Sequence, residues 1–184
     1  MVPDKNSSLD EMQGDGGEFA LWLKPESEVY DILKRIIDRL AADFGAPVFE
    51  PHITLASGIR MPVDEMVGRL ESVAKSADPM TLYLGDTDFR DSFYRSLFVR
   101  IAPNDALLAL RERSLREFRL DHEPYLPHIS LMYKEIDSGK KMQIIERVGK
   151  RFDLVFIPDK IHLVRVSGPA ETWHELLHVP LVAH

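Results

Sequence analysis

The sequence predicts a bilobal α+β fold in which two pseudo-symmetric antiparallel sheets face a central cleft, with helices on the outside. Helix-like and strand-like segments alternate along the 184 residues, and this alternation argues against an all-β sandwich. Predicted hairpins and short connections argue against an all-parallel sheet, whose strands need long crossovers. One five-residue motif also occurs twice, as PHITL at 51–55 and PHISL at 127–131. Its repetition indicates a duplicated α+β unit.

Apolar spacing and chain-breaking residues define the elements in order along the chain. FALWL at 19–23 predicts a short strand that Pro25 ends. Within 26–44, apolar residues recur at spacings of three and four, which predicts an amphipathic helix terminated by Gly45 and Pro47. The remaining predicted elements are a strand at 48–57 carrying PHITL, a helix at 63–77, strands at 81–89 and 96–102, a helix at 104–120 capped by Asn104, the strand carrying PHISL, a helix at 138–152, and closing strands at 154–157, 160–167 and 173–181.

Composition separates a tail from a domain that can bury a core. Residues 1–18 are polar and Gly-rich, without periodicity, which predicts a flexible tail. The rest, 19–184, is predicted to form a single bilobal domain, and 45% hydrophobic residues suffice for its core. The absence of cysteine excludes disulfides and thiolate metal sites.

Charge and hydropathy limit the classes of binding partner that we expect for the chain. The net charge is −7 and no basic stripe is present, so a long nucleic acid is not expected as a partner. No apolar run approaches the ~20 residues that cross a bilayer, and the N-terminus lacks the apolar core of a signal peptide. We therefore expect a cytoplasmic monomer that does not associate with membranes.

The repeated motif places a histidine and a hydroxyl side by side. Side chains alternate faces along a strand, so His52 and Thr54 are predicted to share one face. The same spacing holds for His128 and Ser130. The isoleucine and leucine of each motif then occupy the opposite face, where they can join a core.

Two imidazoles that flank one ligand can form a general acid–base pair, because each titrates near neutrality. The neutral ring accepts a proton from water, and the charged ring protonates the leaving oxygen. The two hydroxyls can donate hydrogen bonds to phosphate oxygens. This arrangement suits hydrolysis of a phosphodiester, especially a strained cyclic one, without a metal or cofactor. The alternative interpretation is coincidence between two ordinary strands that each carry a structural histidine.

The paired His-x-Thr/Ser motifs resemble those of the two-histidine (2H) phosphoesterase superfamily. Within it, FEPHITLASG, LPHISLMY and the early FALWLKP are most similar to the cyclic phosphodiesterases of plants and fungi, over roughly residues 19–181. The resemblance implies an acid–base pair of His52 and His128, with Thr54 and Ser130 on the phosphate. It also implies metal-independent hydrolysis of ADP-ribose 1″,2″-cyclic phosphate, a by-product of tRNA splicing, or of nucleoside 2′,3′-cyclic phosphates. A small cyclic nucleotide or ADP-ribose cyclic phosphate is thus the expected partner.

Four aromatic residues are further candidates for contacting the substrate. Tyr133 matches a family tyrosine, but its odd offset from His128 lets it reach the cleft only if the strand bends or ends nearby. Trp22, Phe93 and Tyr94 are candidates for stacking on a base. For Trp22 core packing is the favoured interpretation, and for the other two it is packing at the rim.

A competing motif lies near the C-terminus, where 174–178 form HELLH. This matches the zinc-peptidase pattern H-E-x-x-H, which requires a helix. Pro169 and Pro180 leave too little room for one, so a closing strand is predicted instead, with Glu175 on one face and His174 and His178 on the other. Two other functions stay open: an RNA-end 2′,3′-cyclic phosphodiesterase of the same superfamily, and a nucleotide-binding module without catalysis.

Overall fold

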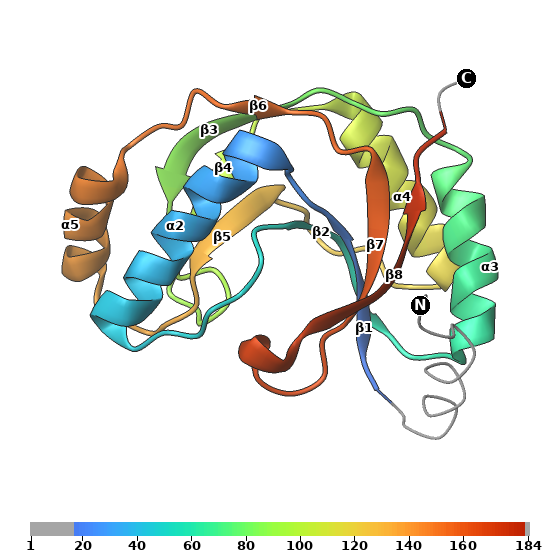
Figure 1. The fold of residues 1–184 in the computed structure, drawn as a ribbon, viewed down its shortest axis with the longest axis horizontal. Helices are drawn as coiled ribbons and strands as arrows, with labels where there is room; N and C mark the ends of the chain where they lie inside the picture. Colours follow the sequence, from blue (N-terminus) through green and yellow to red (C-terminus); the bar gives the residue numbers. More distant parts are fainter. Residues whose placement is uncertain (1–16, 183–184) are drawn as a thin grey trace, which may run out of the picture.

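The computed structural model describes residues 17–182 and confirms the predicted fold class. Within that range there are two four-stranded antiparallel sheets, with strand orders β2-β1-β7-β8 and β5-β4-β3-β6, and four α-helices (Figure 1). The strands are β1 (Phe19–Leu23), β2 (Ile53–Ile59), β3 (Leu82–Asp88), β4 (Leu97–Ile101), β5 (His128–Met132), β6 (Val155–Phe156), β7 (Lys160–Arg165) and β8 (His174–Pro180). The helices are α2 (Ser27–Phe44), α3 (Val63–Ala74), α4 (Asp105–Phe118) and α5 (Ser138–Val148), with a 3₁₀ turn at Ala170–Thr172.

The predicted tail falls mostly outside the described residues, which begin at Gly17. Glu18 differs from that prediction, because its backbone pairs with the chain after β7. Its carbonyl accepts a hydrogen bond from Val166 N at 2.8 Å, and its N–H donates to Ser167 Oγ at 2.8 Å. The hydrogen-bonded structure of the domain therefore includes Glu18.

The two lobes are not successive halves of the chain. Strands β1 and β2 share a sheet with the last strands, β7 and β8, while the middle of the chain supplies the other sheet. Helix α2 follows β1 yet contacts β5, and α4 follows β4 yet contacts β2. Figure 1 shows α2 lying over β4 and β5, and α3 and α4 beside β7 and β8. Each sheet is thus covered in part by a helix that follows a strand of the other sheet in the sequence.

The duplication extends to the strand that precedes each motif. In β1–α2–β2 and in β4–α4–β5, the first strand pairs antiparallel with the motif strand. Trp22 lies opposite Thr54 in the first unit, and Phe98 lies opposite Ser130 in the second. The sequences of the first strands correspond as well, LWLK at 21–24 and LFVR at 97–100, separated by 76 residues like the motifs.

Both motif strands carry a bulge at the motif leucine. On β1, Leu21 and Trp22 are adjacent, yet their partners on β2 are two residues apart, so Leu55 is the extra residue. On β4, Leu97 and Phe98 are adjacent, yet their partners on β5 are two residues apart, so Leu131 is the extra residue there. A bulge shifts the alternation of faces, so the residues after it point to the side opposite to that expected from strict period two.

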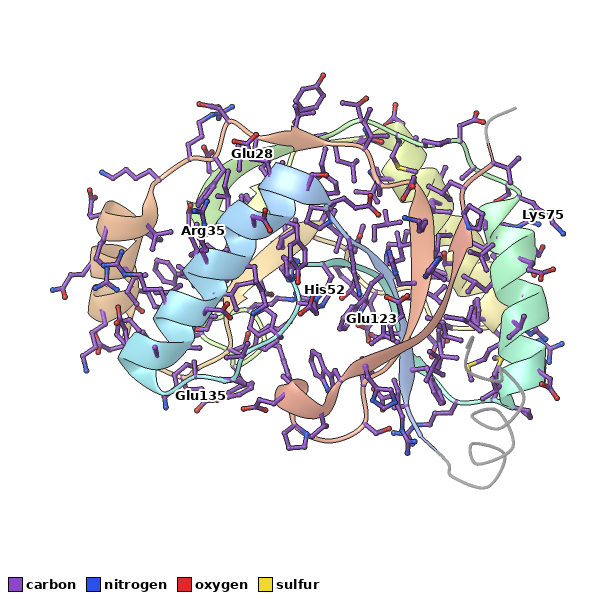
Figure 2. The ribbon with its side chains drawn as sticks, in the orientation of Figure 1. Glu28, Arg35, His52, Lys75, Glu123 and Glu135 are labelled. Atoms are coloured by element: carbon purple, nitrogen blue, oxygen red, sulfur yellow. The ribbon has the colours of Figure 1, made fainter. Side chains whose placement is uncertain are left out.

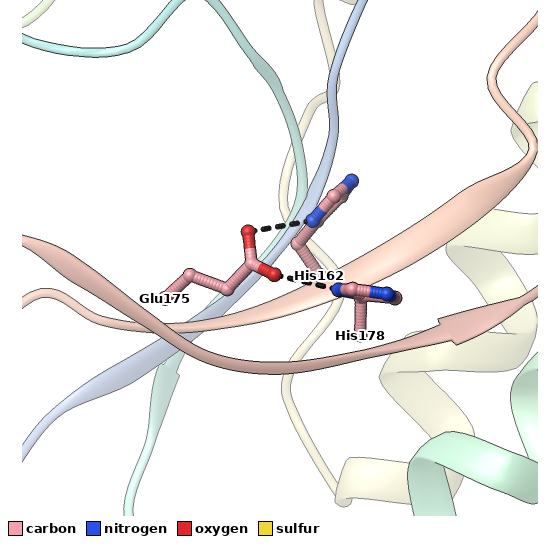
Figure 3. A group of neighbouring side chains, drawn as sticks. All are labelled: His162, Glu175 and His178. Atoms are coloured by element: carbon pink, nitrogen blue, oxygen red, sulfur yellow. Dashed lines mark hydrogen bonds and ion pairs between the residues drawn. The ribbon is translucent and has the colours of Figure 1, made fainter. Parts of the chain in front are cut away.

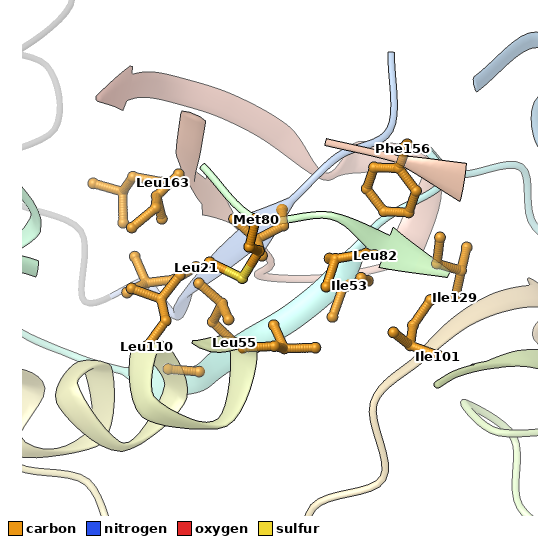
Figure 4. Packing of buried hydrophobic residues seen from close by; sticks show 14 of the residues in the cluster. Leu21, Ile53, Leu55, Met80, Leu82, Ile101, Leu110, Ile129, Phe156 and Leu163 are labelled. Atoms are coloured by element: carbon orange, nitrogen blue, oxygen red, sulfur yellow. The ribbon is translucent and has the colours of Figure 1, made fainter. Parts of the chain in front are cut away.

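One contiguous cluster of buried apolar side chains joins the two sheets (Figure 4). Ile53 and Leu55 from the first motif, and Ile129 and Leu131 from the second, are completely buried in it, as the alternation predicted. Burial of one such side chain stabilises the fold by roughly 1.5–3 kcal/mol. The core face of each motif therefore fixes the register that turns its polar face toward the space between the sheets.

Strand β2 begins later than predicted, at Ile53 rather than at residue 48. Pro47 and Pro51 lack the N–H that a strand ladder needs, so the segment before β2 is irregular. His52 consequently lies just before the strand, whereas His128 is the first residue of β5.

Capping and left-handed residues set the helix ends. Asn104 caps α4 as predicted, since its side chain accepts a hydrogen bond from Leu107 N at 2.9 Å. Helix α5 ends four residues early, at Val148, because Gly149 has φ 125°. Among residues 17–182, none of the helices has the length and apolar character to cross a membrane.

Candidate active site

A cavity of about 320 Å³ lies between the two sheets and receives both motifs. Figure 2 shows His52 in the middle of the molecule. The lining residues are Glu18, Ala20, Trp22, His52, Thr54, Ser57, Val166 and Trp173 from one sheet and its connections, and Tyr94, Arg95, His128, Ser130 and Tyr133 from the other. The two histidines and two hydroxyls predicted from the repeat therefore line one cavity.

The same local hydrogen bond orients each motif histidine. Nδ1 of His52 lies 2.6 Å from the carbonyl oxygen of Glu50, and Nδ1 of His128 lies 2.7 Å from that of Leu126. A carbonyl only accepts, so in both rings Nδ1 carries the hydrogen and Nε2 is the atom free to exchange a proton. The intervening proline holds the preceding residue in extended backbone, which presents its carbonyl to the ring.

An aromatic ring from the neighbouring strand supports each imidazole. Trp22 stacks on His52 with 3.5 Å between ring centroids and 8° between planes. Phe98 meets His128 edge-on, with centroids 4.9 Å apart. Trp22 and Phe98 are the residues opposite the two motif hydroxyls, so the duplicated unit consists of an aromatic residue, a histidine and a hydroxyl.

Burial makes both histidines poor bases in the free protein. Burial, together with the charges of His128 and Lys24, lowers the pKa of His52 to about 3. Burial also lowers the pKa of His128, and the Arg95 guanidinium acts in the same direction. At about pH 7 both rings are neutral until an anion enters the cavity.

The bulge in β5 explains how Tyr133 reaches the cavity. Strand β5 ends at Met132, and the extra residue Leu131 reverses the alternation, so Tyr133 turns to the side of Ser130. Burial raises the pKa of Tyr133, which keeps its hydroxyl protonated, and the Ser130 hydroxyl acts in the opposite direction. Ser130 Oγ also donates to the carbonyl of Tyr94 at 3.2 Å.

Aromatic side chains form the wall of the cavity around His52. Trp22 is buried and also lines the cavity, so its side chain both packs in the core and forms part of the cavity wall. Tyr94 lines it too, with its ring nearly parallel to that of Trp173 at a centroid distance of 6.2 Å. Phe93 does not line the cavity; it packs edge-on against Tyr94 at 5.0 Å and supports the wall from outside.

Six lining residues have no counterpart among the predicted site residues: Glu18, Ala20, Ser57, Arg95, Val166 and Trp173. Ser57 follows the bulge of β2 as Tyr133 follows that of β5, and the pair has the 76-residue spacing of the motifs. Applying that spacing to Tyr133 points directly to Ser57. Trp173 was placed on a predicted strand, whereas it precedes β8 and its Nε1 donates to Gly168 O at 3.1 Å.

Side chains from the second lobe hold the first motif in place. Tyr125 Oη donates to the carbonyl of Thr54 at 3.0 Å, and Arg111 Nη1 donates to that of Leu55 at 2.6 Å. The Arg111 guanidinium also lies over the ring of Tyr125, 4.1 Å from its centroid. These contacts tie the motif strand of one sheet to α4 and the loop that follows it.

HELLH at 174–178 begins β8, as the strand prediction required, and this excludes the helical zinc-peptidase geometry. The predicted alternation of its side chains is wrong. Glu175 and Leu177 are two residues apart on β8, but their partners on β7 are adjacent, so Leu176 is the extra residue of a bulge. The Glu175 carboxylate therefore meets His178 on the same side, with Nδ1 and Oε1 2.8 Å apart.

The sequence matches the family described as cyclic phosphodiesterase-like protein over residues 18–181. The chain belongs to this family. This confirms the resemblance to the cyclic phosphodiesterases of the 2H phosphoesterase superfamily. As a member, the chain is a phosphodiesterase, a hydrolase that acts on cyclic phosphates.

Two relatives of the cyclic phosphodiesterase-like chain have named activities. A cyclic phosphodiesterase of Arabidopsis thaliana is 24% identical over 130 residues, which cover 70% of this chain and 72% of that protein. A 2′,3′-cyclic-nucleotide 3′-phosphodiesterase of Kluyveromyces lactis is 25% identical over 206 aligned positions, which cover 87% of this chain and 97% of the relative.

Solved structures share the fold of this cyclic phosphodiesterase-like chain. A Thermus thermophilus protein superposes with a TM-score of 0.65 at 19% identity, covering 89% of this chain and 97% of its own. Escherichia coli LigT in complex with 3′-AMP superposes with a TM-score of 0.63 at 18% identity, covering 92% of this chain and 100% of LigT.

Proposed function

We propose that the chain hydrolyses small cyclic phosphodiesters without a metal, using His52 and His128 as an acid–base pair. The observation that carries the proposal is the matched orientation of the two rings. Both line one cavity, and both have Nδ1 bound to a backbone carbonyl, which leaves Nε2 for proton transfer. Thr54 and Ser130 line the same cavity and serve as the phosphate-binding hydroxyls.

We assign His52 as the base and His128 as the acid from the difference in their burial. Burial lowers the pKa of His52 to about 3, and this ring is the base. His128, which is less buried than His52, is more readily protonated when a phosphate anion enters the cavity, and is the acid. In the reaction water attacks phosphorus as Nε2 of His52 takes its proton. The bond from phosphorus to one ribose oxygen breaks, and Nε2 of His128 protonates that oxygen.

The surrounding hydroxyls stabilise the charge that develops on the phosphate. Donors aimed at the position where charge appears lower the barrier by roughly 2.7–4 kcal/mol each in comparable sites. Ser130 donates to Tyr94 O in the free protein, and its hydroxyl can turn to a phosphate oxygen when the substrate binds. Tyr133 lines the same cavity and supplies a second protonated hydroxyl there.

The substrates we propose are ADP-ribose 1″,2″-cyclic phosphate and nucleoside 2′,3′-cyclic phosphates. A cavity of about 320 Å³ with aromatic walls suits one nucleotide rather than a polymer. The Kluyveromyces lactis relative is a 2′,3′-cyclic-nucleotide phosphodiesterase, and LigT was crystallised with 3′-AMP, which supports a small nucleotide ligand. Arg95 is a cationic residue at the cavity and would meet a further phosphate group.

A substrate panel in EDTA tests the proposal. It consists of ADP-ribose 1″,2″-cyclic phosphate, the four 2′,3′-cyclic mononucleotides, 3′,5′-cyclic AMP and a short RNA with a 2′,3′-cyclic end. We expect EDTA-resistant turnover of the small 1″,2″- or 2′,3′-cyclic compounds, absent from His52→Ala. Preference for the RNA would support the RNA-end alternative, and activity lost to EDTA and restored by zinc would refute the metal-independent mechanism.

A further inference from the structure

Three side chains with metal-binding groups converge outside the phosphate cavity. His162 of β7 and Glu175 and His178 of β8 each present one ligand atom, and these atoms lie within 4.8 Å of one another (Figure 3). Glu175 Oε2 is 2.8 Å from His162 Nδ1, and Oε1 is 2.8 Å from His178 Nδ1. None of the three lines the cavity that holds the paired motifs.

The sheet itself assembles this cluster. His162 and His178 are direct cross-strand partners, so their side chains share a face of the sheet. The bulge at Leu176 turns Glu175 to that face as well. His162 is nearly buried, with 8% of its surface exposed, and Glu175 and His178 close over it from the solvent side.

We propose that His162, Glu175 and His178 bind a divalent transition-metal ion of the zinc type. Two imidazole nitrogens and one carboxylate oxygen are a donor set that zinc uses with one further position open to water. With bonds of roughly 2.0–2.2 Å, the ligand atoms of a tetrahedral ion lie about 3.5 Å apart. The ligand atoms here are at most 4.8 Å apart and each Nδ1–carboxylate contact is 2.8 Å, so modest adjustments of these distances suffice. Magnesium and calcium prefer sites made of oxygen alone.

Lys24 competes with the ion. Its Nζ lies 2.8 Å from Glu175 Oε2, so a cation must share the carboxylate with an ammonium group or displace it. We therefore expect an affinity well below that of closed structural zinc sites.

The site differs from a zinc-peptidase centre in its ligands. His174, the first histidine of HELLH, is exposed and directs Nδ1 to the carbonyl of Thr172 at 3.0 Å, away from the cluster. Its place is taken by His162 from the adjacent strand. Glu175 is a ligand here rather than a general base, so the ion would link β7 to β8 and not activate water for peptide hydrolysis.

The test is competition for Zn²⁺ between the full-length chain, free of any tag, and a chromophoric chelator, with the visible spectrum of bound Co²⁺ as a second readout. We expect one equivalent of Zn²⁺ and the intense absorption of four-coordinate cobalt. His178→Ala and Glu175→Gln should each weaken binding by roughly tenfold or more. His174→Ala is the matched control, an exposed histidine on the same strand, and should bind like the wild type.

The proposal is overturned if the chain does not compete for Zn²⁺ at micromolar concentration, or if His178→Ala binds as tightly as the wild type. The three side chains would then form only a charge network with Lys24. Equal weakening by His174→Ala would place the ion elsewhere and would also overturn it. Hydrolysis of cyclic phosphates in EDTA is measured on the same proteins; its loss would bear on the proposed function and not on the metal site.

Discussion

At the scale of single residues, one hydrogen bond determines which atom of each motif histidine can react. The carbonyls of Glu50 and Leu126 fix the hydrogen on Nδ1, and burial then sets how readily Nε2 takes a second one. Between the two pKa values His52 is neutral and His128 is charged, which is the combination that the proposed reaction needs.

We expect the pH profile of kcat/KM to be bell-shaped, with its maximum on the acid side of 6.5, the ordinary pKa of histidine. As the pH falls toward about 3, His52 gains a proton and the base is lost. As the pH rises through the lowered pKa of His128, the acid is lost. A bound phosphate anion favours the protonated rings, so the profile of kcat should lie at higher pH.

The pH experiment needs a stability control. Both histidines bind a proton more weakly in the folded state than in the unfolded chain, so unfolding takes up protons and the free energy of unfolding falls as the pH drops below 6.5. Circular dichroism at each pH separates that loss from titration of the base. A flat kcat/KM profile from about pH 5 to 9 in folded protein would contradict the assignment.

Tyr133→Phe should lower kcat about fivefold, because it removes a hydroxyl that lines the cavity with Ser130 and is proposed to donate to the phosphate, and a neutral hydrogen bond contributes about 1 kcal/mol. The stack of its ring on Phe49, with centroids 3.9 Å apart, is preserved, so the melting temperature should change little. Tyr83→Phe, at an exposed position outside the cavity, is the matched control and should retain full kcat. Equal kcat in all three proteins would remove Tyr133 from the proposed chemistry.

The sequence identifies the residues at the cavity where a motif repeats, whereas from the β3–β4 connection it indicates Tyr94 and misses Arg95. His52, Thr54, His128 and Ser130 all line the predicted cleft. Arg95 lines it as well, but it comes from the connection between β3 and β4, where no periodicity predicts a direction for the side chain.

At the scale of the elements, β-bulges decide which side chains share a face. Alternation correctly predicted the core positions of both motifs, but not the facing of the residues after the bulges at Leu55 and Leu131. A bulge adds one backbone residue without a distinctive side chain, so the hydrophobic pattern does not reveal it. The same limitation accounts for the wrong faces assigned to Glu175 and His178 on β8.

Element boundaries followed the chemistry of the capping residues. Asn104 made the start of α4 predictable, because its side chain bonds to an N–H that the helix leaves unpaired. Pro47 and Pro51 delayed β2, and Gly149 stopped α5 before the predicted end at residue 152. The start of β2 and the end of α5 are therefore both set by prolines or a glycine in the sequence.

Exchange of both His174 and His178 for alanine should leave cyclic phosphate hydrolysis in EDTA within about twofold of wild type. Both side chains lie on β8 outside the cavity, and both are exposed, so neither change disturbs the core. His52→Ala, assayed alongside, should lose activity. A comparable loss in the double variant would show that β8 takes part in the reaction.

At the scale of the whole molecule, the site exists because two sheets built from different parts of the chain meet. The first and last strands form one sheet and the middle of the chain forms the other, a partition that local pattern does not encode. The sequence predicted two facing antiparallel sheets from the repeat, but not that α2 and α4 would each pack against the other lobe's motif strand. Each histidine therefore depends on the lobe opposite for its position across the cavity.

The central claim is that the two imidazoles act as one catalytic unit, and a double-mutant cycle on kcat in EDTA tests it most directly. The proteins are the wild type, His52→Ala, His128→Ala and the double variant, each checked for an unchanged fold. A positioned acid or base contributes typically ~10²–10⁴-fold, so each single variant should lose activity in that range. The double variant should lose far less than the product of the two losses, because paired groups fail together. Near-full activity in either single variant, or losses that multiply, would contradict the account.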